Sequence, residues 1–159
     1  MKEFNNIISN VVNNDVFMRL QNINHHGITR YNHSMRVAYY TYRITKTLKL
    51  NFEEATEAAL LHDFFINEVD CENKLFKLRR HPRYALENAS KYFDLTELEK
   101  DIILTHMFPI TFTPPKYLES WIVDIVDDVS AIYEKIYCIR KELNAAFMFL
   151  FILLINYLK

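Results

Sequence analysis

Three histidines and two aspartates interrupt segments of the chain that are otherwise apolar at helical spacing. His33, His62 and His106 each fall on the apolar side of such a segment, Asp63 directly follows His62, and Asp127 stands among aliphatic residues. If these side chains were buried separately, each imidazole or carboxylate would need its own hydrogen-bonding partner. A shared cation satisfies all of them together, so the pattern predicts a metal centre.

The types of ligand restrict the metal. Imidazole and carboxylate without thiolate suit divalent first-row ions, namely Mn, Fe, Co, Ni or Zn, whereas a site made only of oxygen ligands would favour Mg or Ca. We therefore expect one or two divalent transition-metal ions as the cofactor.

The order of these residues resembles that of a known family. The pattern is a His, then a His-Asp doublet, then an Asp, and it lies within residues 30–38, 60–63 and 126–127. In these contexts it is similar to the HD-domain metal-dependent phosphohydrolase superfamily, and residues 81–89 and 101–109 resemble an uncharacterised bacterial subgroup of it. The resemblance implies an all-α fold, with His33, His62, Asp63 and Asp127 as ligands of a first metal.

Two further histidines raise the question of a second metal. His81 and His106 lie between the doublet and the last Asp, where dinuclear members of the superfamily carry two more ligands. The resemblance therefore implies a second ion held by His81 and His106, with Asp63 bridging the two ions. The alternative is that His81 caps a helix and that His106 contacts another ligand or the substrate.

A basic segment ends near the proposed ligand His81. Residues 72–83 contain five Lys or Arg residues and one Glu. Such a run can be a solvated helix face, or it can attract and hold a phosphate. Our candidate substrate-binding residues are Lys77, Arg80 and Arg83, together with Arg30, which lies three residues before His33 and can grip phosphate with two donors.

These features predict a metal-dependent phosphohydrolase, either a phosphomonoesterase or a phosphodiesterase, in which His62, Asp63 and Asp127 are catalytic. A bound divalent cation lowers the pKa of coordinated water from about 15.7 towards 7 and neutralises phosphoryl charge. We expect the substrate to be a nucleotide or another small phosphorylated metabolite. Because Asp128 stands where many members of the superfamily have Lys, the alternative is a catalytically silent regulator that binds a metal or ligand.

The elements that must position these residues are all predicted to be helices, about six to eight of them, in one HD-like domain over residues 1–159. Asn51 and Thr96 each precede a Glu by three residues, which is typical of a helix start. The four prolines are expected between helices or at a helix start.

Two of the expected helices carry proposed ligands. Over residues 31–48, an apolar face is expected to share the inward side with His33, and a long helix over about residues 116–140 is expected to carry Asp127. The residues expected on these two apolar faces are Val37, Tyr40, Ile44 and Leu48, and then Ile122, Val126, Val129 and Ile136.

Composition excludes several other classes of protein. The net charge of −1 argues against a nucleic-acid polymer or a membrane surface as partner. Gly27 is the one glycine, which excludes glycine-rich phosphate loops and makes tight hairpins unexpected. Two cysteines, Cys71 and Cys138, are too few for a disulfide framework and are expected in ordinary packing, and without a secretory leader we expect a cytoplasmic protein.

The C-terminal segment is the most apolar part of the chain. Residues 145–155 form a run of 11 apolar residues, well short of the ~20 needed to span a bilayer. We expect a helix that is buried either in the core or against a second subunit. In the second case the protein would be a homo-oligomer.

Overall fold

Helices account for almost all of the regular structure. The computed structural model describes residues 1–25, 27–66 and 74–157. The elements in these ranges are α1 (Lys2–Val12), α2 (Asp15–Met18), the 3-10 helix η1 (Arg19–Asn22), β1 (Asn24–His25), β2 (Ile28–Thr29), α3 (Arg30–Thr47), α4 (Phe52–Leu61), α5 (Lys74–Tyr92), α6 (Glu97–Thr105) and α7 (Leu118–Tyr157). The expected all-α fold is confirmed.

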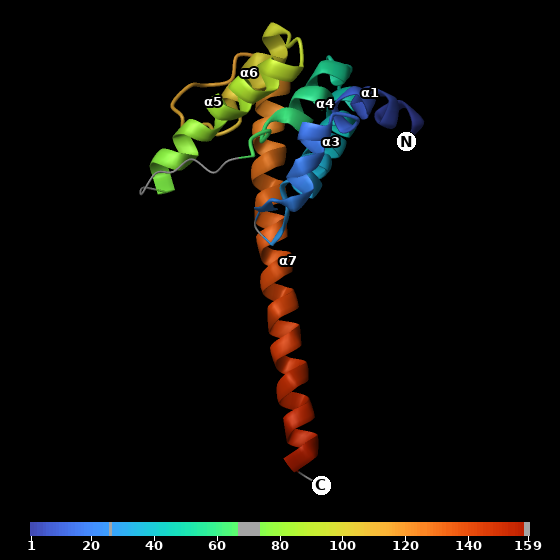
Figure 1. Cartoon of the computed structure of the whole chain (residues 1–159), viewed down its shortest axis with the longest axis vertical. Helices are drawn as coiled ribbons and strands as arrows, with labels where there is room; N and C mark the ends of the chain where they lie inside the picture. The colour runs from blue at the N-terminus through green and yellow to red at the C-terminus, as the bar shows by residue number, and fades with distance from the viewer. Residues whose placement is uncertain (26, 67–73, 158–159) are drawn as a thin grey trace.

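The long helix α7 is the axis of the molecule. The other helices gather around its N-terminal half, and its C-terminal half extends beyond them as far as Tyr157 (Figure 1). Helix α3 packs against α4 and α7, and α6 packs against α4, α5 and α7. None of the helices in the described ranges combines the length and apolar composition that crossing a bilayer requires.

One apolar core joins the first helices of the chain to those that carry the histidines. Phe4 and Phe17 from α1 and α2 are buried in the same cluster as Leu60, Ile102 and Val123 from α4, α6 and α7. Burying such side chains away from water stabilises the packed helices. Helices α1 and α2 are therefore part of the body that supports the histidines.

Polar caps fix where the histidine-bearing helices begin. Thr96 and Glu99 form a reciprocal capping box at the start of α6, and the Asn51 side chain accepts a hydrogen bond from the Glu54 N–H at the start of α4, as the sequence predicts. The Thr29 hydroxyl accepts a hydrogen bond from the Asn32 N–H, at 3.2 Å, at the start of α3. Because a cap fixes the residue at which a helix begins, these caps also fix the positions of the histidines along the axes of α3, α4 and α6.

The start of α7 is anchored to α6 by a buried carboxylate. Asp101 Oδ2 accepts hydrogen bonds from the Lys116 N–H at 2.9 Å and from the Ser120 hydroxyl at 2.8 Å. The carboxylate therefore fixes the position of α7 along α6, and with it the position of Asp127.

The predicted inward face of α3 is only partly correct. Val37 is buried with His33, but Tyr40, Ile44 and Leu48 are exposed. The buried side of α3 is instead lined by small or polar residues such as Ser34, Ala38, Thr41 and Thr45. Close packing of α3 against α4 favours small side chains, so the larger apolar residues lie outside the contact.

The predictions for α7 need a similar correction. Ile122 and Val126 are buried, whereas Val129 and Ile136 are exposed. The helix does not end near residue 140 but continues to Tyr157, and residues 145–150 are exposed, so this part of the apolar run is not in the core.

Pro82 also departs from the prediction, because it lies inside α5 and not at a helix start. A proline inside a helix removes one main-chain hydrogen bond, but its fixed φ still fits helical backbone. Because α5 already begins at Lys74, His81 lies inside the helix and is not a helix cap.

A two-residue hairpin, which the sequence made unexpected, joins β1 to β2. Asn24 pairs with Thr29 and His25 with Ile28 in antiparallel register. The loop holds Gly27, whose φ of 88° is a conformation that favours glycine. A Cβ built on Gly27 would lie 2.2 Å from Cys138 Sγ, so the glycine also allows the hairpin to approach α7.

Cys138 is half-buried against this hairpin, in keeping with the expected packing role. Cys71 lies outside the described residues.

Candidate metal centre

Six side chains from separate parts of the chain converge at one place inside the bundle. They are His33 on α3, His62 and Asp63 at the end of α4, His81 on α5, His106 at the end of α6, and Asp127 on α7. All six are buried except His81, which is partly exposed. The structure thus brings together every residue that the sequence analysis proposed as a metal ligand.

Short distances link the six side chains. Asp127 Oδ1 lies 2.8 Å from His33 Nε2 and 3.5 Å from His62 Nε2. Asp63 Oδ1 lies 3.5 Å from His81 Nε2 and 3.8 Å from His106 Nε2. Each aspartate therefore faces two histidines.

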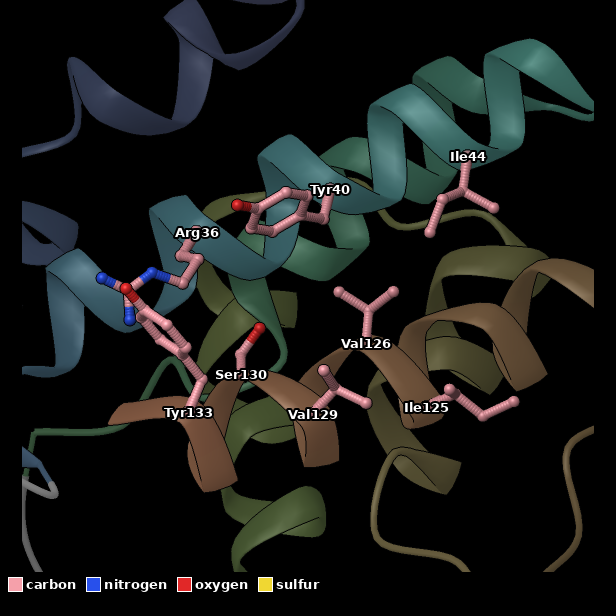
Figure 2. Close-up of a pocket in the computed structure, with 8 residues that line it drawn as sticks. All are labelled: Arg36, Tyr40, Ile44, Ile125, Val126, Val129, Ser130 and Tyr133. Carbon is pink, nitrogen blue, oxygen red and sulfur yellow. The ribbon is translucent and has the colours of Figure 1, made fainter. Parts of the chain in front are cut away.

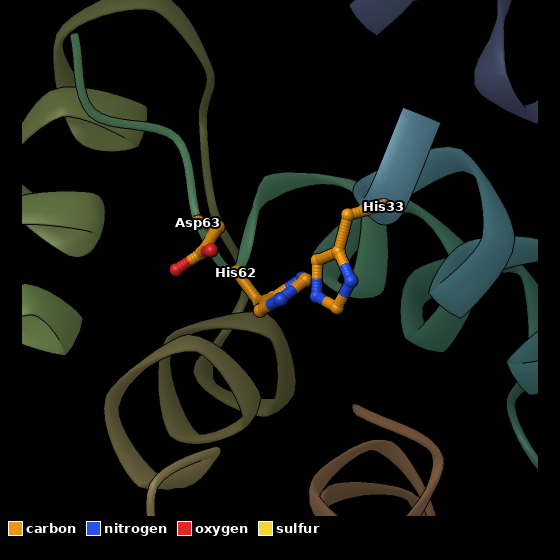
Figure 3. A group of neighbouring side chains, drawn as sticks. All are labelled: His33, His62 and Asp63. Atoms are coloured by element: carbon orange, nitrogen blue, oxygen red, sulfur yellow. The ribbon is translucent and has the colours of Figure 1, made fainter. Parts of the chain in front are cut away.

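The cluster divides into overlapping groups of potential ligands. In each group, one ligand atom from every member lies within 4.8 Å of the others. The groups are His33, His62 and Asp63, then His62, His106 and Asp127, and finally Asp63, His81 and His106. Figure 3 shows the first group, with the rings of His33 and His62 next to each other.

Local backbone geometry orients two of the histidines. His62 and His106 are the C-cap residues of α4 and α6. In each ring Nδ1 lies 2.7 Å from a carbonyl oxygen three residues earlier, that of Ala59 or Ile103. A carbonyl can only accept a hydrogen bond, so Nδ1 carries a proton in both rings and Nε2 is the nitrogen left to face a metal.

The third histidine is oriented by a carboxylate that the sequence analysis missed. His33 Nδ1 donates a hydrogen bond to Glu134 Oε2 at 3.0 Å, and the other oxygen of Glu134 accepts from Arg36 at 2.5 Å. Glu134 is almost completely buried. It lies seven residues after Asp127, two helical turns along the same face of α7, and this spacing is the signal in the sequence that could have identified it.

The electrostatics of the cluster agree with a site for a cation. Burial opposes a charge on His33, but hydrogen bonds to Asp127 and Glu134 raise the pKa of His33 to about 10. Burial likewise opposes ionisation of Asp127, yet His62 and His33 hold its pKa well below the usual range. The positive charge of protonated His33 therefore balances the negative charge of Asp127, a role that a bound metal could take over. Metal binding would then displace the proton from His33.

The two histidines on the other side of the cluster, His106 and His81, are kept neutral. Burial, with the neighbouring His62 and His81, lowers the pKa of His106 to about 3. Burial also lowers the pKa of His81. Their Nε2 atoms lie 2.8 Å apart, close enough for one cation to contact both.

One buried atom tests whether a metal fits these residues. His62 Nε2 is buried and makes no hydrogen bond within the described part of the chain. A buried polar atom without a hydrogen bond costs about 1–3 kcal/mol, and a bond from Nε2 to a metal would remove that cost. Donors of imidazole and carboxylate type, oriented towards one point, fit a divalent transition metal.

Arg30 lies at the edge of the cluster. Its Nε is 3.8 Å from Asp63 Oδ2, its Nη1 donates to the Phe65 carbonyl at 2.6 Å, and its guanidinium stacks 3.9 Å from the Phe65 ring centre. The structure therefore places this candidate substrate-binding residue next to a proposed ligand.

The basic run of α5 is divided between two places. Lys77 lies one turn before His81 on the same face of the helix. Arg80 and Arg83 instead line a separate hollow of about 290 Å³, together with Arg79, Thr111 and Thr113. None of the six clustered residues lines that hollow, so the structure does not bring Arg80 and Arg83 to the centre.

A family model agrees with this geometry. The model of the HD domain matches residues 30–132, which is more than half of the chain and contains all six clustered residues. No curated protein and no solved structure matches the chain. The chain therefore belongs to the HD domain family, the superfamily of metal-dependent phosphohydrolases.

Proposed function

We propose that this protein is a metal-dependent phosphohydrolase that cleaves a phosphate ester of a nucleotide or another small phosphorylated metabolite. The observation that supports it most is the orientation of His33, His62 and His106, whose Nδ1 atoms are engaged so that their Nε2 atoms face Asp63 and Asp127. A buried centre that only filled the core would not need three oriented imidazoles and two carboxylates at one point.

In this proposal, His33, His62, Asp63 and Asp127 would hold a first divalent ion, and His81 and His106, next to Asp63, would hold a second one. Bound there, the ions would supply an activated water and positive charge for the phosphoryl oxygens. The chain's own contribution is to hold the ligands rigidly, because a carboxylate and two main-chain carbonyls fix the three rings.

Two basic residues are proposed to hold the substrate. Arg30 is fixed beside Asp63 by Phe65, so its guanidinium is placed to orient a phosphate without further ordering. Lys77 is half-buried on the face of His81 and can attract the anion. Replacing Lys77 with Ala should therefore raise KM more than it lowers kcat.

The test is turnover by metal-loaded protein on mononucleotides, dinucleotides, sugar phosphates and aryl phosphates. We expect hydrolysis of at least one class, which a chelator abolishes. Asp63→Asn should remove both turnover and most of the metal, because Asp63 faces two histidines and Arg30. Asp128→Asn, at the exposed carboxylate next to Asp127, is the matched control and should keep both.

Metal binding without turnover on any of these substrates would contradict the proposal and favour the regulator that binds a metal or ligand. A cytoplasmic location stays a prediction from the sequence.

A further inference from the structure

The outer side of α7 carries a regular row of exposed apolar side chains. Their spacing alternates between four and three residues from near the start of the helix to its exposed half. The first six, each between 48% and 65% exposed, are Ile125, Val129, Ile132, Ile136, Ile139 and Leu143. Ala146 and Leu150 continue the same spacing and are also exposed. We call these eight residues the seam.

The seam has the period of a coiled coil. Apolar residues at alternating spacings of three and four occupy the a and d positions of a heptad, which pack between paired helices. Here Val129, Ile136, Leu143 and Leu150 are at a, and Ile125, Ile132, Ile139 and Ala146 are at d. A contiguous apolar row of this length marks an interaction surface.

A groove borders the seam at its N-terminal end. It lies between α3 and α7 and has a volume of about 500 Å³. Figure 2 shows Tyr40 and Ile44 of α3 facing Val126 and Val129 of α7. Because Val129 belongs to both the seam and the groove, one partner helix could cover the two together.

We propose that a second copy of this chain covers the seam, with the two α7 helices antiparallel. In an antiparallel pair a residues face d residues of the other helix. With Ile136 opposite the partner's Ile139, Val129 faces the partner's Ala146 and Ile125 faces the partner's Leu150. Each seam residue then meets an apolar one, and the exposed C-terminal half of each α7 lies along the N-terminal half of the other.

Charges beside the seam favour this register. Lys135 and Glu142 both occupy g positions, and g residues face g residues in an antiparallel pair. The register that pairs the seam also brings Lys135 opposite the partner's Glu142, and the two-fold axis repeats this contact. A parallel pair would instead place Lys135 opposite the partner's Arg140, which is repulsive.

The same register gives the groove an occupant. Val126 is at an e position, and e residues face e residues of the antiparallel partner. The partner's Phe147 therefore lies over Val126, at the mouth of the groove that Tyr40 and Ile44 line. The contact is the same on both copies, so the assembly closes as a dimer and does not grow into a filament.

The first test is the mass and the dissociation constant of the full-length chain by sedimentation at several concentrations. We expect twice the chain mass of 19.1 kDa. Ile136→Glu should weaken the dimer at least about tenfold, because the dimer contains position 136 twice. Lys141→Glu, at the exposed f position of the same heptad, is the control and should not weaken it. Unchanged metal content and helical circular dichroism show that each variant is folded.

The second test distinguishes the orientation of the helices. Lys135→Glu and Glu142→Lys should each weaken the dimer, and the double variant should restore it. A dimer that Lys135→Glu strengthens would be parallel and would overturn the proposal. A chain that stays monomeric at tens of micromolar, or a monomer that sediments with phosphatidylcholine and phosphatidylserine vesicles, would also overturn it.

Discussion

The ring of His33 is held between two carboxylates, one on each nitrogen. Asp127 faces Nε2, where a metal would bind, and Glu134 accepts from Nδ1 on the other side. A carboxylate on Nδ1 fixes the ring and makes Nε2 a stronger ligand, so Glu134 acts on the metal through His33.

Glu134→Gln tests this role, since it preserves the size of the side chain and removes its charge. We expect metal binding about 10–100-fold weaker, measured by competition with a coloured chelator. Glu97→Gln, at an exposed carboxylate of α6, is the control and should leave metal affinity unchanged. If Glu134→Gln binds metal as tightly as the unmodified protein, Glu134 does not position His33 for the metal.

The six clustered residues could be predicted from the sequence, whereas Glu134 was not. Each of the six belongs to a short motif or interrupts an apolar face, which a sequence displays directly. Glu134 has no such local context, because its environment is created only when α3 packs against α7 and Arg36 reaches its second oxygen. Its one local signal is the spacing of two helical turns from Asp127.

Helices α5 and α6 each bring one histidine to the second side of the cluster. The Nε2 atoms of His81 and His106 meet at 2.8 Å, and both rings face Asp63. We expect metal-saturated protein to hold about two ions per chain, and His81→Ala or His106→Ala to hold about one. Elemental analysis after titrated loading measures this. One ion per chain in all three proteins would make the two histidines neighbours of a single site.

The contact of α4 with α6 makes stability depend on pH. Burial and the nearby Glu99 raise the pKa of Glu57 to about 7. Because this pKa lies above the ordinary value of 4.5, the contribution of Glu57 to stability is fully present below about pH 4.5 and is lost as pH rises from there through about 7.

Glu57→Gln imitates the protonated carboxyl, so it should raise Tm at pH 8 and change it little at pH 4. Because Glu57 is half-exposed and solvent screens its charge, the expected rise at pH 8 is only about 2 °C. Thermal melts at both pH values check this. Glu87→Gln, at an exposed position of α5, should change neither. An equal shift from Glu57→Gln at both pH values would mean that its ionisation does not matter.

Helix starts could be predicted from the sequence, but the sides of the helices that face inward could not. Asn51 and Thr96 cap α4 and α6 because a cap depends on residues adjacent in the chain. Tyr40 and Val129 were expected inside because they are apolar, yet both are exposed. The inner sides of α3 and α7 hold polar residues such as His33 and Asp127 beside apolar ones such as Val37 and Val123, so apolar character alone does not identify the buried side.

At the scale of the whole molecule, the metal centre joins helices that are distant in sequence. His33 and Asp127 are 94 residues apart and meet at 2.8 Å. A metal that binds only the folded chain stabilises it, by about 2.7 kcal/mol when its concentration is 100 times its dissociation constant. For a chain of this size, 1 kcal/mol corresponds to about 2–4 °C, so a chelator should lower Tm by about 5–10 °C.

Calorimetry with and without a chelator measures this difference. Asp63→Asn, which is expected to lose the metal, should show almost no response to the chelator. A Tm that does not change for either protein would mean that the cluster is stable through its own ion pairs alone.

The apolar run over residues 145–155 shows that composition predicts a helix but not what the helix packs against. Its composition predicted a helix, and the structure has one, but a coiled-coil seam and a core helix differ in what surrounds them. The exposure of residues such as Phe147 and Leu150 separates the two cases.

The contact between Gly27 and Cys138 has a consequence for how this protein can evolve. The two residues are 111 positions apart, yet a methyl group on one would overlap the sulfur of the other. A side chain at position 27 is therefore accessible only after position 138 has lost its sulfur, and the φ of Gly27 adds a further cost. In descendants of this chain the two sites should change in that order, with a glycine or alanine at 138 preceding any replacement at 27.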